Sequence, residues 1–597
     1  MTVKGGVPVA EKAKTGGQSF LQGAMVLGVS MVIVKIMGMV YKILLARVLD
    51  GVGNGIFNIA YELYNPLFML ATAGFPIAIS RMVSESVAQG RYRDVRKLHR
   101  ISIPIFICTG MICFLLMLIG GNFYADLVES SESKLAIFML SPMILFGCLM
   151  AIYRGYYEGL RNMVPTAVSE IIEASGKLLL GLSLAYLVSY FGTQEYQTSG
   201  TLFGQAIANE EAFYTQLMSY TVAAAILGIA IGAFCGFLYL FLRHKIKGDG
   251  IRRVQLVHAP PSRPAKSITK QLITTAFPIG LGAIIMSISG TIDSTLVQLR
   301  ILDIMESQPD LLQSYFDFVD PSYFLPNADG DFKIQTFLFG SYGYSLTLMM
   351  LVTAVTQVFG TSALPSITAA WTARNKKRIR RSIETVLRTT TLVTLPAGFG
   401  MSVLAWPITN LVYGNGNNSA EVQIASNVLQ IMGISVIFIA TSTPVCSMLQ
   451  AVGRVDLPLK LLTIGMVIKI ILNYTLVGIP SVNIQGAAVG SLVGYLFVLV
   501  MGLYFLCKET KIIPNFVTVF IKPLLAALLC AVTAILSYNL IVLVIPTKIA
   551  TILAILLAVV IYAIALFLLR AITKDDINML PKGKKIAKTL EKHHLIR

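Results

Sequence analysis

Long apolar stretches alternate with short polar connections along almost the whole chain. A helix needs about 20 apolar residues to cross ~30 Å of hydrocarbon. Fourteen stretches of this kind can be placed, at about 20–46, 56–83, 100–121, 134–153, 166–190, 218–242, 271–299, 336–371, 384–411, 422–450, 458–477, 484–507, 515–544 and 548–570. The pattern predicts an all-α polytopic membrane protein with 14 transmembrane helices.

Composition agrees with this prediction and adds an orientation. Hydrophobic residues make up 55% of the chain, charged residues only 13%, and the mean hydropathy is +0.73, outside the range of soluble proteins. The net charge of +18 comes from lysines and arginines in alternate connections, at 91–100, 243–270, 374–381 and 570–597. By the positive-inside rule these connections and both termini are cytoplasmic. Because the basic residues follow the parity of the connections, nucleic acid is not an expected partner.

Other chemistry has little support in the sequence. The seven cysteines lie inside apolar stretches, and the five histidines show no metal spacing. No P-loop is present and no cleavable signal precedes the first span, so that span is expected to act as the signal anchor. We therefore expect no catalytic group, metal or cofactor. Transport would draw on a coupling ion (Na+ or H+), on the membrane potential or on the substrate gradient.

Three landmarks recur in the same order in both halves of the chain, which indicates an internal repeat. Arg-Val-Leu-Asp at 47–50 recurs as Arg-Ile-Leu-Asp at 300–303, Pro76 is matched by Pro365, and Arg161 with Pro165 by Arg454 with Pro458. Six spans per half is an even number, so both halves enter the membrane from the same side. The sequence predicts two parallel six-helix repeats with the substrate site between them, followed by two extra C-terminal helices.

This repeat divides the chain into five expected parts. They are an N-terminal lobe at 1–243, a cytoplasmic linker at 244–270, a C-terminal lobe at 271–507 with an external insertion at 301–335, the last two helices at 508–571, and a basic tail at 572–597. The cluster of five lysines at 582–592 in the tail suits anionic lipid of the inner leaflet. A solvated tail that only obeys topology is the alternative.

Charged residues inside the apolar stretches are the candidate functional groups, because a central lysine costs about 2.5–3.5 kcal/mol on insertion scales. Their number predicts a polar cavity in the membrane. Lys35 has no evident partner and is expected to contact an anion. Lys42 and Glu62 reach similar depths and could form an ion pair. The predicted substrate-binding residues are Lys35, Lys42, Glu62, Lys177 and Lys469.

Three carboxylates are candidates for ion coupling. Glu173 precedes Lys177 by four residues, the favourable order for an intrahelical pair, and Glu170 lies on a neighbouring face. Such pairs could also be purely structural. Asp293, beside Thr291 and Ser294, could bind a cation or proton, or make a hydrogen-bonded helix contact. Lys469 occupies in the second half the place that Lys177 has in the first.

Four short motifs occur at characteristic places in the predicted spans: Lys35-Ile36-Met37-Gly38, Phe75-Pro76, Gly159-Leu160-Arg161 before Pro165, and Leu364-Pro365-Ser366. In their order and spacing they resemble the multidrug/oligosaccharidyl-lipid/polysaccharide (MOP) exporter superfamily, and within it the SpoVB/YtgP-like polysaccharide transporters, relatives of the MurJ lipid II flippases.

The resemblance implies V-shaped lobes that alternate access in a bacterial plasma membrane. It implies a substrate as well, an undecaprenyl diphosphate-linked saccharide such as the peptidoglycan precursor lipid II, moved from the inner to the outer leaflet. The last two spans would form a groove for the lipid tail, and cell-wall synthesis proteins would be partners.

The resemblance also implies a role for one residue, and the sequence differs from the family at four other positions. Lys35 stands where MurJ-like proteins carry an arginine that helps hold the diphosphate. Other charged positions of that family fall here on Phe68, Met69, Ser345 and Leu346.

Two other functions are open on the sequence. One is an ion-coupled small-molecule antiporter of the same superfamily, against which the two extra spans and Lys35 count, since a carboxylate normally holds cationic drugs. The other is a membrane enzyme that polymerises or ligates sugars on the outer side. For that reaction only the acidic loop at 303–331 offers candidate groups.

Overall fold

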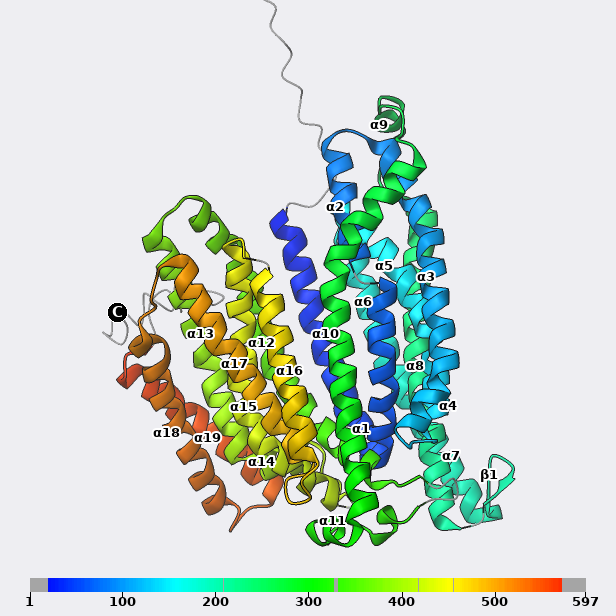
Figure 1. Cartoon of the computed structure of the whole chain (residues 1–597), viewed down its shortest axis with the longest axis vertical. Helices are drawn as coiled ribbons and strands as arrows, with labels where there is room; N and C mark the ends of the chain where they lie inside the picture. The colour runs from blue at the N-terminus through cyan, green and yellow to red at the C-terminus, as the bar shows by residue number, and fades with distance from the viewer. Residues whose placement is uncertain are drawn as a thin grey trace, which may run out of the picture.

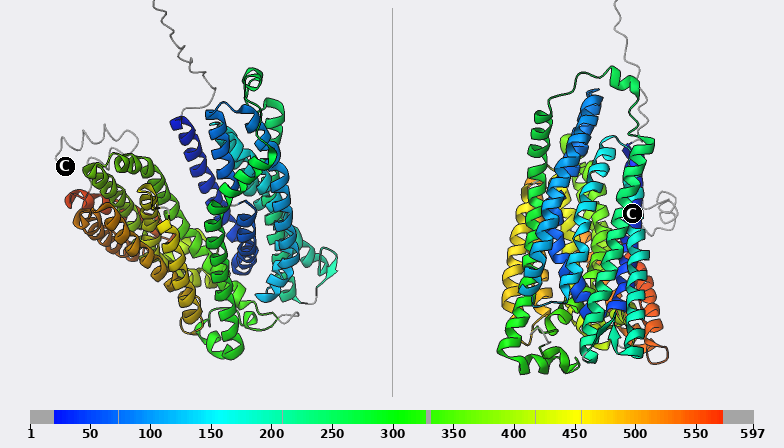
Figure 2. Two further views of the ribbon diagram at one scale, coloured as in Figure 1. Left: turned by 45° about the horizontal axis from the view of Figure 1, so that its top comes forward. Right: turned by 90° about the vertical axis from the view of Figure 1, so that its right-hand side faces the viewer.

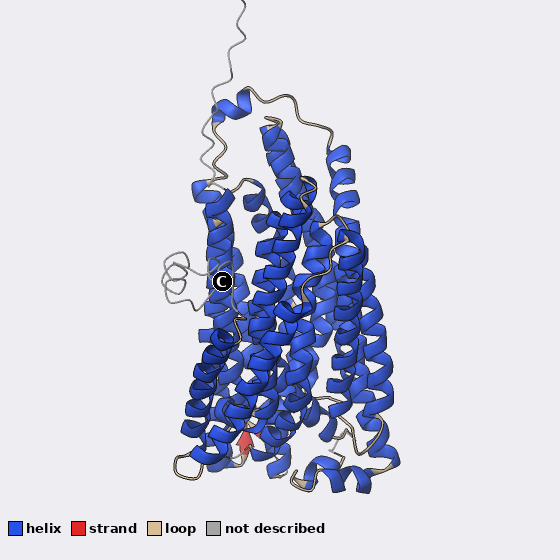
Figure 3. Cartoon of the chain, turned by 90° about the vertical axis from the view of Figure 1, so that its left-hand side faces the viewer, coloured by secondary structure: helices blue, strands red, loops and turns tan. Residues whose placement is uncertain are grey.

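The computed structural model describes residues 20–571 except 73, 208, 327–330, 417 and 455. It is 85% helical (Figure 3). The only strands among the described residues, β1 (Thr201–Leu202) and β2 (Gln205–Ala206), form an antiparallel hairpin. The basic tail expected at 572–597 lies outside the described residues.

The helices form two bundles (Figure 1). The first consists of α1 (Phe20–Thr72), α2 (Phe75–Ala88), α3 (Tyr92–Leu127), α4 (Ser133–Leu140), α5 (Pro142–Gly159), α6 (Val164–Gly176), the π-helix η1 (Lys177–Gly181), α7 (Leu182–Ser199) and α8 (Glu210–Lys247). The connection that follows contains α9 (Arg253–Val257) and leads into α10 (Ala265–Ser307). Helix α10 packs on α1 and α2 on one side and on α16 on the other.

The second bundle contains α12 (Ile334–Thr372), α13 (Lys376–Val403), α14 (Ala405–Val412), α15 (Ser419–Ala451), α16 (Asp456–Val477) and α17 (Gln485–Thr510). The π-helix η3 (Val517–Ile521), α18 (Lys522–Ile541) and α19 (Thr547–Leu568) follow, and α18 and α19 pack against each other. Between α10 and α12, the polar insertion forms α11 (Pro309–Tyr315) and the 3-10 turn η2 (Pro321–Phe324). Side chains of this insertion, among them Leu312 and Phe324, join the hydrophobic core that α1 and α12 share.

Among the described residues, 11 helices are long and apolar enough to cross a membrane, or 12 when α13 and α14, bent by 87°, count as one span. The prediction of an all-helical polytopic membrane protein is confirmed at this level. Helix α1 contains the first two expected spans as two limbs, which meet at a kink where Asp50 has non-helical dihedral angles (φ 52, ψ −161). The number fourteen and the repeat stay predictions.

The two bundles meet at one end and diverge toward the other (Figure 2, left). We call the end that carries α11 and η2 the acidic end, and the end that carries α9 and the start of α13 the basic end. At the acidic end, Asn54 Nδ2 of α1 donates to the Gly340 carbonyl of α12 at 2.6 Å. A side chain at Gly55 would collide with the backbone of Thr336. The bundles therefore touch backbone to backbone there, which only small residues allow.

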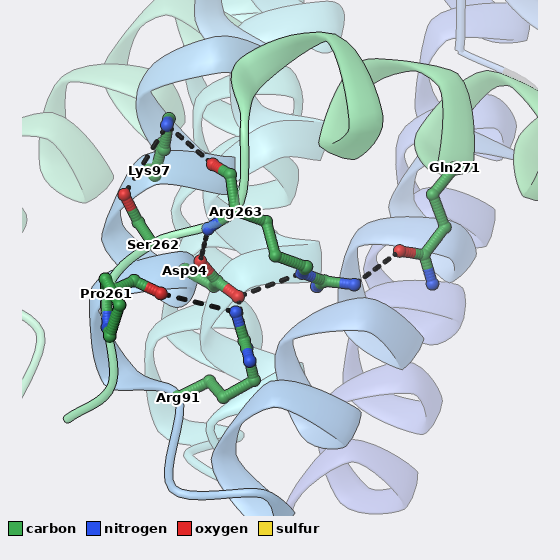
Figure 4. Close-up of polar contacts among 7 residues, drawn as sticks. All are labelled: Arg91, Asp94, Lys97, Pro261, Ser262, Arg263 and Gln271. Carbon is green, nitrogen blue, oxygen red and sulfur yellow. Dashed lines mark hydrogen bonds and ion pairs between the residues drawn. The ribbon is translucent and has the colours of Figure 1, made fainter.

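The connection from α8 to α10 is fastened to α3 at the basic end (Figure 4). Asp94, only 2% exposed, accepts hydrogen bonds from Arg91 Nε at 2.6 Å and from the backbone N and Nε of Arg263 at 2.8 and 2.9 Å. Lys97 Nζ donates to the Arg263 carbonyl at 2.6 Å, and Arg263 Nη1 donates to Gln271 Oε1 of α10 at 2.9 Å. The segment expected as a linker is thus ordered, and it ties α3 to α10.

Candidate functional site

Lys35 lies on the first limb of α1, which stands between the two bundles in Figure 1. Its side chain is exposed, and its Nζ donates to Gln357 Oε1 of α12 at 2.9 Å. No carboxylate of the described residues forms a salt bridge with it. The ammonium is therefore held by a neutral amide from the opposite bundle, and its charge is available to an anion.

Lys42 and Glu62 lie on the two limbs of α1, and both are half-buried. They interact electrostatically, yet the described residues contain no direct salt bridge between them. Glu62 instead accepts a hydrogen bond from Ser294 of α10, while Thr291 Oγ1 donates to the Glu62 carbonyl at 2.8 Å. The expected ion pair is thus replaced by contacts to α10, because the second limb of α1 packs against that helix.

Asp293 of α10 forms a buried ion pair with Lys469 of α16. The Lys469 Nζ lies 2.6 Å from Asp293 Oδ2, and the exposed fractions of the two side chains are 15% and 6%. Asn473, one turn further along α16, donates from Nδ2 to Asp293 Oδ1 at 2.6 Å. The sequence left two roles for Asp293, a cation or proton site and a hydrogen-bonded contact between helices. The contacts to Lys469 and Asn473 match the second role. A bound cation would have to displace the ammonium.

Lys177 lies against aromatic rings. Its Nζ is 4.9 Å from the ring centroid of Tyr41 and 5.7 Å from that of Tyr61, both within cation–π range. It also interacts electrostatically with Lys42 and Glu173. Tyr41 and Tyr61 each carry a buried hydroxyl without a hydrogen-bond partner among the described residues. The Lys177 ammonium and the unpaired hydroxyl-bearing rings of Tyr41 and Tyr61 thus lie close together inside the first bundle.

The intrahelical pair expected between Glu173 and Lys177 is not formed. Arg154 of α5 takes the Glu173 carboxylate, with Nη2 at 2.8 Å from Oε2, and the helix changes to π-geometry at Lys177. Glu170 accepts a hydrogen bond from Ser30 Oγ of α1 at 3.2 Å. These two glutamates therefore belong to a separate group around Arg154. Arg154 lies at the edge of an expected span, so its burial is not evident from the sequence.

The structure brings most of the predicted residues together. Electrostatic contacts link Glu62 to Lys42, Lys469 and Asp293, and Lys42 to Lys177. The cluster, which we call the inter-bundle charge cluster, therefore holds three lysines and two carboxylates. Lys35 lies seven residues before Lys42, about 10 Å nearer the basic end at 1.5 Å per residue. Within the described part of the chain, no group of histidine, cysteine or acidic residues could hold a metal ion.

Sequence comparisons divide the chain between two family models. Residues 20–303 match the model of polysaccharide biosynthesis proteins, and residues 334–561 match that of the lipid II flippase MurJ. Lipid II flippase MurJ of Bacillus subtilis (strain 168) is 24% identical over 492 residues, which cover 81% of each protein. Stage V sporulation protein B of the same organism is 21% identical over 490 residues, covering 81% of this chain and 82% of that protein.

Solved structures show the same fold. A structure of lipid II flippase MurJ in an inward closed conformation matches with a TM-score of 0.60 at 15% identity, covering 91% of this chain and 98% of that one. An inward-facing multidrug resistance MATE transporter of the MOP superfamily matches with a TM-score of 0.58 at 12% identity, covering 81% and 98%. Both likenesses concern the arrangement of helices.

Proposed function

We propose that this chain is a transporter of the MOP exporter superfamily, not an enzyme, and that it moves a lipid-linked saccharide across a bacterial plasma membrane. The matches of its two halves to the polysaccharide biosynthesis and MurJ models, and its similarity to MurJ and stage V sporulation protein B, support this proposal. The proposed substrate is an undecaprenyl diphosphate-linked saccharide, with lipid II as the first candidate. The observation that carries this proposal is Lys35, an exposed cation between the bundles that no carboxylate of the described residues neutralises.

The anion site differs in its residues from that of the family. Ser345, at one of the positions where MurJ-like proteins carry charge, is fully buried and donates to the Ala425 carbonyl at 2.6 Å. Phe68, at another, stacks on Tyr64 with ring centroids 5.3 Å apart. Neither can bind a diphosphate. Recognition therefore rests on Lys35, with Lys42 and Lys177 next along the path toward the acidic end.

Alternating access fits the way the bundles meet. We take the basic end as the cytoplasmic side, following the positive-inside rule. Contact at the acidic end and divergence at the basic end then describe an inward-facing state, in which the headgroup enters from the cytoplasm. Two parallel repeats that rock about the acidic end would move it outward, while the exposed apolar side chains of α18 and α19, such as Leu536 and Val560, offer a surface for the lipid tail.

The proposed driving force is the membrane potential. Moving one elementary charge is worth about 2.3 kcal/mol per 100 mV, so the two charges of a diphosphate would gain roughly 4–5 kcal/mol if they crossed uncompensated. Asp293 is occupied by Lys469, so a sodium ion or proton would couple through this pair only by breaking it. Glu62, Glu170 and Glu173 are the other carboxylates at which coupling can be tested.

The test is reconstitution in liposomes with a labelled undecaprenyl diphosphate saccharide. Appearance of the unmodified lipid in the outer leaflet supports the proposal. A covalently changed product supports the glycan polymerase or ligase, and gradient-driven uptake of cationic drugs without lipid movement supports the antiporter. Rescue of a strain depleted of its lipid II flippase would identify lipid II as the substrate.

A further inference from the structure

The first bundle carries two hollows, and both are lined by residues of α3, α5 and α8. Helices α3 and α8 lie on the side of this bundle that is turned away from the second bundle (Figure 1). We call the surface of α3, α5 and α8 that includes both hollows the groove. One hollow, of about 390 Å3, lies at the basic end and is lined by charged and aromatic side chains. The other, of about 370 Å3, lies deeper and is lined almost entirely by apolar ones. Neither belongs to the inter-bundle charge cluster.

The charged hollow is built around Asp249, which follows α8. Its two carboxylate oxygens accept hydrogen bonds from Arg96 of α3, at 2.7 Å from Nε and 3.1 Å from Nη2, and the Tyr156 hydroxyl donates to Oδ2 at 3.2 Å. Burial by itself raises the pKa of Asp249, but these hydrogen bonds outweigh it and hold that pKa below the usual aspartate range. The Arg96 charge is therefore already matched.

Two further side chains in this hollow, Arg100 and His99, are not matched by an acid. Arg100 is exposed and has no hydrogen-bond or salt-bridge partner among the described residues. His99 is only 8% exposed, and its Nε2 has no partner in the described part of the chain. Its ring stacks on that of His244 of α8, with centroids 4.7 Å apart and an interplanar angle of 21°. Arg100 thus supplies an unmatched positive charge in this hollow, and His99 supplies an unpaired ring nitrogen beside it, which suits an anion.

The apolar hollow lies deeper along the helices than the charged hollow, by about the thickness of one lipid leaflet. Along α3, eleven residues separate Ile103 of the charged hollow from Phe114 of the apolar one, which is about 16 Å of helix, and along α8 ten residues separate His244 from Phe234, about 15 Å. Half of a ~30 Å hydrocarbon core is the same length. Exposed apolar side chains, such as Ile107 at 43%, lie along α3 between the two hollows.

We propose that this groove binds one anionic phospholipid, with its phosphate headgroup against Arg100, beside the stacked rings of His99 and His244, and one acyl chain in the apolar hollow. Basic pockets between transmembrane helices at the cytoplasmic surface are the kind that hold anionic headgroups. A zwitterionic lipid would fill the apolar hollow equally well and gain less from Arg100. A water-soluble phosphate would use only the charged hollow. The bound lipid would join α3 to α8 beside the Arg96–Asp249 pair.

The experiment is native mass spectrometry of the purified full chain in detergent, titrated with phosphatidylglycerol or with phosphatidylcholine. The wild type is expected to retain one phosphatidylglycerol more tightly than phosphatidylcholine. Arg100→Ala should weaken phosphatidylglycerol about fivefold, since an arginine near the surface contributes about 1 kcal/mol toward an anionic lipid. Leu227→Trp, which fills the apolar hollow, should weaken both lipids. Arg378→Ala, which removes an exposed arginine from the basic end of the other bundle, should change neither.

Two results would overturn the proposal. If Arg100→Ala and Arg378→Ala weaken phosphatidylglycerol equally, the lipid responds to overall charge and not to this groove. If glycerol 1-phosphate displaces the lipid completely and Leu227→Trp has no effect, the charged hollow binds a free phosphate and the apolar hollow takes no part. Size-exclusion profiles that match the wild type show that the variants are folded. His99→Gln, which keeps a side-chain donor, tests the headgroup contact without removing the charge of Arg100 from α3.

Discussion

Removing Lys469 should destabilise the protein far more than removing an exposed lysine from the same helix. The Nζ lies 2.6 Å from Asp293 Oδ2, and both side chains are mostly buried. At an effective dielectric constant of about 20, Coulomb's law gives roughly 6 kcal/mol for this separation before desolvation is subtracted. Breaking a buried pair on one side typically costs about 3–5 kcal/mol, because it leaves a buried charge without compensation. We expect this loss for Lys469→Met.

A double-mutant cycle separates the pair from the individual side chains. Asp293→Asn in the Lys469→Met background removes the stranded carboxylate, so the double variant should recover most of the stability lost by Lys469→Met alone. The measurement is thermal unfolding in detergent, followed by size-exclusion chromatography with fluorescence detection. Lys460→Met is the matched control, because Lys460 pairs with Asp456 on the exposed surface of α16 at 3.2 Å and should matter little.

One outcome of the double-mutant cycle would contradict this reasoning. If the double variant is as unstable as the sum of the two single variants, the pair does not stabilise the fold. Transport by the double variant then carries separate information: loss of dependence on a sodium or proton gradient, with flipping itself retained, would assign Asp293 to coupling instead.

Three further predictions follow from individual contacts. Lys35→Gln should lower flipping in liposomes about tenfold or more, while Lys35→Arg should retain most of it. A tenfold loss corresponds to about 1.4 kcal/mol of lost interaction with the diphosphate. Equal activity of the two variants would exclude an ionic role for Lys35. Gly55→Leu should spread the acidic end, because its side chain would meet the Thr336 backbone, and a cysteine probe placed there should label faster than in the wild type. Asp249→Asn should lower the melting temperature at neutral pH by removing the negative charge that pairs with Arg96. Because the pKa of Asp249 is depressed in the folded state, its contribution to stability is present above the usual aspartate range and is lost as the pH falls through the folded-state pKa. The melting temperatures of wild type and variant should therefore converge in acid. A difference that stays constant with pH would contradict this.

Much of the fold was predictable because a membrane makes local sequence informative. A helix that faces lipid must satisfy its own backbone and present apolar side chains, so hydropathy alone locates the helices. The order of short motifs added the superfamily. Burial of charge is expensive in the same solvent, which is why Lys35, Lys42 and Lys469 stood out without any knowledge of their surroundings.

The partners of those charges were not predictable in the same way. Asp293 and Asn473 are 180 residues apart, and they meet because α10 packs on α16. Glu173 has a lysine at the ideal helical spacing and still binds Arg154, because the helix widens into a π-turn and another helix presents a better donor. Spacing within one helix fixes which side chains share a face, but not which neighbour lies opposite that face.

The sequence by itself determined that this chain is a polytopic helical membrane protein with costly lysines in its first half, because hydrophobic length and charge cost are properties of single segments. Only the tertiary structure decided that Lys35 is held by a neutral amide from the opposite bundle while Lys469 is neutralised by Asp293. The physical reason is that a charge is matched by whatever lies within a few ångströms of it, and that distance is set by how helices pack and rotate against one another.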